Sequence, residues 1–211
     1  MGAFMISFSP VFVSLVNVSP TTSGFYRVFF GGVALTTFIF LSGRRLSFNK
    51  SIWIALVFSA VFFTADLWFW HRSILYVGPG LSTLLANFQV FFMLLASIML
   101  FKQQPTKMQI IAIPIALLGL LAIVGIDWNQ LHSDYRLGVI FGLLTAVSYT
   151  GYMLFMRQAQ IDSKHVLPVR EIAIMSLLVA LSLGVIAQVE GESLAINSLQ
   201  DLSLLLAYGL F

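Results

Sequence analysis

Seven long apolar runs constrain the fold of this 211-residue chain more than any other feature. A helix that crosses the hydrocarbon core of a membrane needs about 20 mostly apolar residues. The runs are continuous and do not alternate with period two, so they predict helices and not the strands of a membrane barrel. We therefore expect an all-α membrane protein, a polytopic helix bundle. The runs cover residues 3–18, 25–41, 52–77, 81–101, 108–126, 137–156 and 172–189, and an eighth begins at Leu199.

The composition excludes a water-soluble domain. Hydrophobic residues make up 59% of the chain and charged residues only 9%, whereas soluble domains carry roughly 25% charged residues. Soluble enzymes and nucleic-acid binders are excluded on this ground, and we expect the lipid bilayer to be the partner of the helices. The chain has no cysteine, which excludes thiolate metal sites and thiol nucleophiles. No metal and no cofactor are expected.

The loop charges predict the orientation in the membrane. Numbered from the N-terminus, the odd loops carry mostly acidic residues, and eight of the eleven Lys and Arg residues fall in the even loops. Because Lys and Arg are favoured in cytoplasmic loops, the pattern predicts a cytoplasmic N-terminus. The eight are Arg44, Arg45, Lys50, Lys102, Lys107, Arg157, Lys164 and Arg170.

A weak internal repeat is also present. When Pro168 is laid on Pro20, the second and third apolar runs begin near the seventh and the eighth. An odd number of spans in each repeat would invert the second copy in the membrane. We expect a first repeat of five helices over residues 1–130, and a second over residues 137–211 that is truncated after about two and a half helices.

Asp66 is the only acidic residue inside a predicted span. It lies about 21 Å along its helix from the predicted cytoplasmic end, near the middle of the membrane. An ionisable group there costs roughly 2.5 to 3.5 kcal/mol, so it normally faces protein or water and marks a functional site. Two interpretations stay open: Asp66 binds a solute or a proton, or it forms a structural ion pair with Arg27 or Arg72.

Helical geometry predicts which neighbours share a face with Asp66. Trp70 is four residues away and lies on the same face, whereas His71 is rotated by about 140°. By the same geometry, Asn87 and Gln89 point to nearly opposite sides, so at most one is expected to face a cavity. The alternative interpretation places His71 and Arg72 at the outer membrane interface and makes the two amides interhelical hydrogen-bonding groups.

One further polar stripe lies in the sixth span. Thr145, Tyr149 and Tyr152 follow one another at spacings of four and three, so their hydroxyls fall on one face and could line a path.

Catalytic constellations are mostly missing from the predicted spans. An intramembrane aspartyl protease needs two carboxylates in its spans, and a serine-type site needs a buried Ser with a buried His; neither set is found in the sequence. Passage of a small solute is favoured. An intramembrane lipid-modifying enzyme and a non-transporting structural or sensing subunit remain alternatives.

Three segments resemble the EamA-type transporters of the drug/metabolite transporter superfamily. They are V-S-P-T-T-S-G-F-Y-R (Val18 to Arg27), A-D-L-W-F-W-H-R-S-I (Ala65 to Ile74) and T-L-L-A-N-F-Q (Thr83 to Gln89). The resemblance implies a ten-helix carrier of the inner membrane, built from two five-helix repeats of opposite orientation. Gln89 departs from many relatives, which have Pro at that position.

The expected function is secondary transport of small organic metabolites by alternating access, without enzymatic activity. The partner is then a small-molecule solute, and a homodimer remains an open alternative. The residues expected to bind the solute are Asp66, Trp70 and Asn87, followed by Arg27, His71 and Tyr149.

Overall fold

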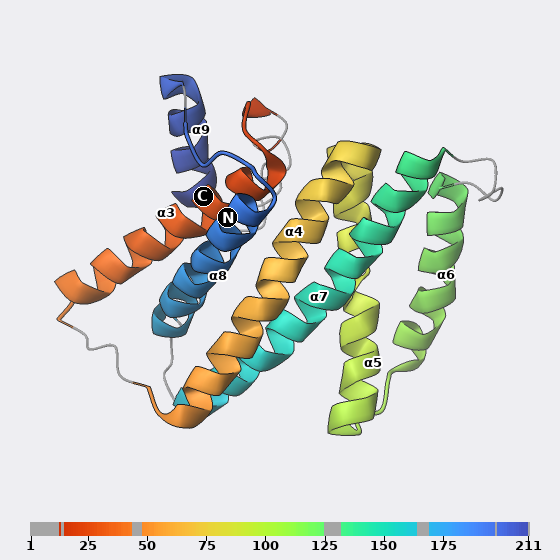
Figure 1. Cartoon of the computed structure of the whole chain (residues 1–211). Helices are drawn as coiled ribbons and strands as arrows, with labels where there is room; N and C mark the ends of the chain where they lie inside the picture. The colour runs from red at the N-terminus through yellow and green to blue at the C-terminus, as the bar shows by residue number, and fades with distance from the viewer. Residues whose placement is uncertain are drawn as a thin grey trace.

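In the computed structural model, the described residues are 13, 15–43, 48–124, 132–163, 169–196 and 198–210, and they form helices and connecting segments without a strand. Most of the predicted run 3–18 lies outside these ranges. Figure 1 shows the arrangement of the helices. Their bounds are α3 Pro20–Leu41, α4 Lys50–Ala86, α5 Gln89–Phe101, α6 Lys107–Val124, α7 Ser133–Ser163, α8 Val169–Val189 and α9 Leu199–Leu210.

Capping side chains mark where the first two of these helices begin. The Ser19 hydroxyl accepts a hydrogen bond from the backbone N–H of Thr22, and Pro20 occupies the first turn of α3. The Asn49 side chain accepts from the backbone N–H of Ile52 at 2.9 Å and so caps α4. Both caps satisfy donors that a helix leaves without a partner at its N-terminus, and proline is well suited to the first turn.

The helix α4 contains a turn at residues 78–80, in the gap between the predicted runs 52–77 and 81–101. Gly78 has φ 78° and ψ 166°, a backbone conformation that glycine adopts without steric cost, and Pro79 follows it. At this point the chain reverses: Figure 1 shows α4 reaching its yellow end and the chain returning through α5. The predicted boundary between the spans 52–77 and 81–101 is therefore confirmed.

The prediction of one uninterrupted helix over 81–101 is wrong. The structure ends α4 at Ala86 and begins α5 at Gln89, with a turn between them. Here the N–H of Phe88 donates to the carbonyl oxygen of Leu85 at 3.0 Å, and the N–H of Phe91 donates to the carbonyl oxygen of Phe88 at 2.9 Å. These i→i+3 bonds are of the 3₁₀ type. They keep the backbone donors satisfied, which allows an irregular segment at this depth.

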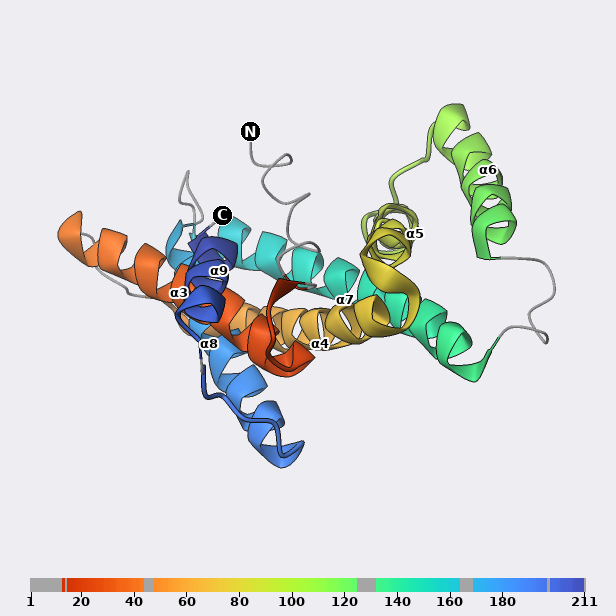
Figure 2. The ribbon, with the colours of Figure 1, turned by 90° about the horizontal axis from the view of Figure 1, so that it is seen from above.

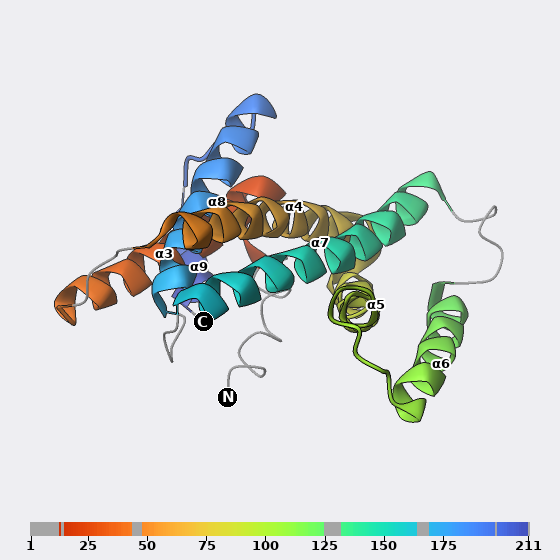
Figure 3. The same cartoon turned by 90° about the horizontal axis from the view of Figure 1, so that it is seen from below.

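The core lies between α3, α4, α7 and α8. Its fully buried members include Leu56, Leu67, Val179 and Leu183. Figures 2 and 3 show α4 and α7 running side by side through the molecule, with α5 and α6 on one side and α3, α8 and α9 on the other. The pair approaches closely at Gly142, where an added Cβ would lie 2.7 Å from the Cβ of Leu85.

The described helices are those of a polytopic helical membrane protein. Four helical segments are long and apolar enough to cross a membrane, and α6 and α9 add shorter apolar helices. The outer face of α6 exposes large apolar side chains such as Ile111, Ile115 and Leu118, as expected for a surface that meets lipid. The four segments are Pro20–Leu41, Lys50–Phe101, Ser133–Ser163 and Val169–Val189.

Candidate solute-binding site

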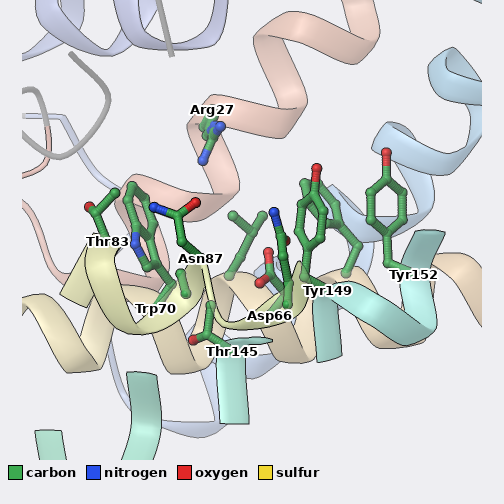
Figure 4. Close-up of a pocket in the computed structure, with 12 residues that line it drawn as sticks. Arg27, Asp66, Trp70, Thr83, Asn87, Thr145, Tyr149 and Tyr152 are labelled. Atoms are coloured by element: carbon green, nitrogen blue, oxygen red, sulfur yellow. The ribbon is translucent and has the colours of Figure 1, made fainter. Parts of the chain in front are cut away.

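A cavity of about 230 Å³ lies where α3, α4, α5 and α7 meet. Its wall combines a carboxyl group, a guanidinium group, two amides, two threonines and several aromatic rings. Figure 4 shows the labelled side chains gathered around it. The lining residues are Arg27, Phe63, Asp66, Leu67, Trp70, Thr83, Ala86, Asn87, Gln89, Thr145, Tyr149 and Tyr152.

Asp66 contributes the only carboxylate of this wall. The residue is 5% exposed. Within the described part of the chain, the carboxylate has neither a hydrogen bond nor an ion pair within 4.0 Å, so the predicted alternative of a structural pair with Arg27 or Arg72 is not found there. A buried carboxylate without a partner is costly in the absence of a ligand, and such a group is a candidate for binding one.

Arg27 contributes the cation and approaches the cavity from α3, across from Asp66 (Figure 4). Its Nη1 donates to the hydroxyl of Tyr208 at 3.3 Å. The guanidinium also lies 5.0 Å from the ring centroid of Tyr208 and 5.7 Å from that of Trp70. These distances are within the range of cation–π attraction. The guanidinium is thus held by aromatic groups and not by the carboxylate of the same cavity.

Asn87 and Gln89 both line the cavity, and the prediction that at most one of them faces it is wrong. That prediction applied a regular rotation of 100° per residue across the pair. The helix is interrupted at Asn87 and Phe88, so the regular rotation does not hold there. The interruption places two amide side chains on one wall.

The side chains from α7 form the aromatic end of the wall. Thr145, Tyr149 and Tyr152 all line the cavity, on the stripe that their spacing predicts. The rings of Tyr149 and Tyr152 pack edge to face at 5.2 Å, and Phe63 packs against Tyr152 at 4.5 Å. This wall offers aromatic faces and two phenol hydroxyls to a bound molecule.

The structure brings five of the six residues proposed for solute binding to this cavity and places His71 outside its lining. His71 is 1% exposed and lies beneath the wall, where its Nδ1 is 2.7 Å from the carbonyl oxygen of Leu67. Phe63 as a wall residue and Tyr208 as a partner of Arg27 were not expected from the sequence. Nothing in the local sequence marks Tyr208, because its contact with Arg27 joins residues 181 positions apart.

Arg72 forms an ion pair with Glu190, the residue that follows α8, and its position at the outer membrane interface stays a prediction. Its Nη2 lies 2.6 Å from Oε1 of Glu190, and its guanidinium stacks 3.9 Å from the ring centroid of Trp68. Trp68 Nε1 donates to the same carboxylate at 2.9 Å, and so does the Thr21 hydroxyl. The segment after α8 is thereby tied to α3 and α4.

The bonds to Glu190 are strong enough to change its acidity. Partial burial alone would raise the pKa of this carboxyl, but the hydrogen bonds from Arg72, Trp68 and Thr21 outweigh that effect. The pKa of Glu190 is therefore lowered below its ordinary value near 4.5. The carboxylate is charged at neutral pH and holds its three donors.

Comparison with known proteins identifies the class. The profile of the EamA-like transporter family matches residues 1–125, more than half of the chain. The chain belongs to the EamA-like transporter family, and it is a multi-pass membrane protein. No curated protein and no solved structure matches it.

Proposed function

We propose that this protein is a secondary carrier that moves small organic solutes across the membrane by alternating access, with the cavity of Asp66 and Arg27 as its solute site. Membership of a transporter family supports the proposal. The observation that carries it is the presence of a carboxyl group and a guanidinium group in one cavity without an ion pair between them within 4.0 Å. Two such groups leave their strongest interactions for a third molecule.

The wall also favours one kind of solute. Arg27 can bind an anionic or carbonyl group as a fork of donors, and Asp66 can bind an ammonium group or another donor. The rings of Trp70 and Tyr149 lie in the same wall and suit an apolar or aromatic part of the solute. A dipolar solute that carries an ammonium and a carboxylate group beside an apolar or aromatic part satisfies all four residues, whereas a singly charged solute leaves one charge without a partner.

The proposed topology has a cytoplasmic N-terminus in the inner membrane. It divides the chain into repeats at 1–130 and 137–211, related by inversion. The Lys and Arg residues of the even loops support the orientation. The interrupted helix at Asn87 supports the location of the site, because carriers built from inverted repeats often bind solutes where spanning helices are broken.

A flux assay in proteoliposomes tests the proposal. A broad metabolite panel is supplemented with three probes that share one ring: phenylalanine, which is dipolar, 3-phenylpropionate, which is anionic, and 2-phenylethylamine, which is cationic. We expect protein-dependent flux, with dipolar solutes competing about tenfold better than the singly charged analogues, since each lost charged hydrogen bond costs about 1.5 to 3 kcal/mol. If no member of the panel moves faster than in protein-free liposomes, the carrier proposal fails, and the enzyme and subunit alternatives gain.

A further inference from the structure

The cavity cation is the end of a chain of hydrogen bonds that joins three helices. Arg27 on α3 donates to the Tyr208 hydroxyl on α9 at 3.3 Å. The Tyr208 hydroxyl in turn lies 3.4 Å from Nε2 of His71 on α4, and Nδ1 of His71 lies 2.7 Å from the carbonyl oxygen of Leu67. Tyr208 and His71 are 3% and 1% exposed, so water contributes little to this chain.

The direction of each bond follows from chemistry. The Leu67 carbonyl can only accept, so Nδ1 of His71 carries a hydrogen and donates to it. In the neutral ring, Nε2 is then an acceptor and receives the Tyr208 hydroxyl hydrogen. The oxygen of Tyr208 accepts from Arg27, which has only donors. All three bonds therefore have complementary partners.

From this chain we propose that Tyr208 and His71 are positioning residues for the solute site, because they hold the Arg27 guanidinium at the cavity wall in the orientation that binds the anionic end of a solute. The inference rests on the proposed function. It assigns a role to two residues that are not among those lining the cavity. His71 acts from behind the wall, through Tyr208, and does not touch the solute.

The need for such support follows from the arginine side chain itself. A long side chain loses up to about 2 kcal/mol of rotamer entropy when it is fixed. A site that fixes the side chain before the solute arrives does not lose this free energy on binding. The Tyr208 hydroxyl and the rings of Tyr208 and Trp70 fix it here without neutralising its charge.

Glycines allow the supporting residues to approach. A Cβ on Gly209 would lie 2.9 Å from the carbonyl oxygen of Arg27, and one on Gly31 would lie 2.9 Å from the carbonyl oxygen of Gly209. Helix α9 thus packs against the backbone of α3 beside Arg27, which brings Tyr208 within reach. A Cβ on Gly24 would lie 3.3 Å from Cε1 of His71, so a larger residue there would press on the imidazole.

The test measures the exposure of Arg27 directly, by its rate of modification with phenylglyoxal, mapped by mass spectrometry on the protein in liposomes. Tyr208→Phe removes the hydroxyl and keeps the ring, and His71→Leu removes the acceptor for that hydroxyl. His71→Gln keeps an acceptor. Tyr76→Phe is the matched control, because Tyr76 is 40% exposed and is not among the cavity-lining residues.

We expect Tyr208→Phe and His71→Leu to raise the modification rate of Arg27 about tenfold, and His71→Gln and Tyr76→Phe to leave it near the wild-type rate. Tyr208→Phe should also weaken competition by phenylalanine about tenfold and leave that of 2-phenylethylamine unchanged. A wild-type modification rate in Tyr208→Phe overturns the inference, and so does an equal rise in His71→Leu and His71→Gln.

Two controls keep the result interpretable. The unfolding midpoint of each variant shows whether it is folded, and if His71→Leu is not, the comparison of Tyr208→Phe with Tyr76→Phe decides alone. The modification rate needs no transport, so it separates the two proposals. If the protein moves no solute but the predicted order of rates holds, the carrier proposal fails and the positioning of Arg27 stands.

Discussion

Arg27 and Asp66 face one cavity from α3 and α4, yet their side chains form no ion pair within 4.0 Å. Opposite charges in a membrane protein normally pair, because each is costly to bury alone. Arg27 is held away from the carboxylate by the Tyr208 hydroxyl and by two aromatic rings. The separation leaves room for a molecule that contacts both charges, and this relationship underlies the account of the site.

The tie between Arg72 and Glu190 gives a prediction about stability. Glu190→Gln removes the negative charge that binds Arg72 and accepts from Trp68 and Thr21. Both side chains of the pair are about a fifth exposed, which limits the effect. We expect a loss of about 1 kcal/mol, measured as a lower unfolding midpoint in detergent. A midpoint equal to that of the wild type would show that the pair contributes nothing.

The same carboxylate gives a prediction about pH. Its pKa is lowered in the folded protein, so its charged form stabilises the fold above the ordinary value near 4.5. This contribution disappears as the pH falls through the lowered pKa. The difference in unfolding midpoint between the wild type and Glu190→Gln should therefore be constant from pH 7 to about 5 and shrink at lower pH. A difference that grows on acidification would refute the assignment.

The contact between α4 and α7 gives a prediction about packing. Gly142→Ala adds a Cβ at 2.7 Å from Leu85 and 3.1 Å from the Ser73 hydroxyl oxygen. Overpacking of this kind costs about 1 to 3 kcal/mol. Gly119→Ala is the matched control, because its Cβ would meet nothing within 4 Å and alanine favours a helix. The unfolding midpoint should be lower than that of the wild type for Gly142→Ala and unchanged or higher for Gly119→Ala. If Gly142→Ala has the midpoint of the wild type, α4 and α7 can move apart there without loss of stability.

Much of the fold follows from the sequence because hydrophobicity and turn residues act locally. The apolar runs predict α3, α6, α7 and α8 within a few residues at most ends, and Gly78 with Pro79 predicts the reversal after the first part of α4. The helix α7 extends further than predicted, to Ser163, because polar residues continue it beyond the apolar run.

The break at Asn87 could not be predicted in the same way. The sequence around it contains no glycine or proline, and the segment is apolar apart from Asn87 and Gln89. Packing against α7 is a long-range effect that the local pattern does not report. For example, the Thr150 hydroxyl on α7, which donates to the carbonyl oxygen of Ala146 at 2.8 Å, also lies 3.4 Å from the carbonyl oxygen of Gln89. A regular helix through Asn87 predicts the wrong relative direction for the side chains of Asn87 and Gln89, so the sequence does not predict that both amides line the site.

The charged members of the site were easier to find than their supports. Asp66 and Arg27 stand out because charges are rare in membrane spans. Tyr208 and Phe63 do not, since aromatic residues are common throughout this chain. The contribution of Tyr208 depends on helices that meet only in the folded structure, as α9 meets α3 beside Arg27.

Flux through Asp66→Asn in proteoliposomes tests the central claim most directly. The substitution keeps the size of the side chain and removes its charge, and Asp162→Asn, at the far end of α7, is the control. The account predicts that Asp66→Asn retains the fold, with an unfolding midpoint no lower than that of the wild type, and loses solute flux at least about tenfold, while Asp162→Asn transports normally. Wild-type flux in Asp66→Asn would contradict the claim that this carboxylate binds the solute.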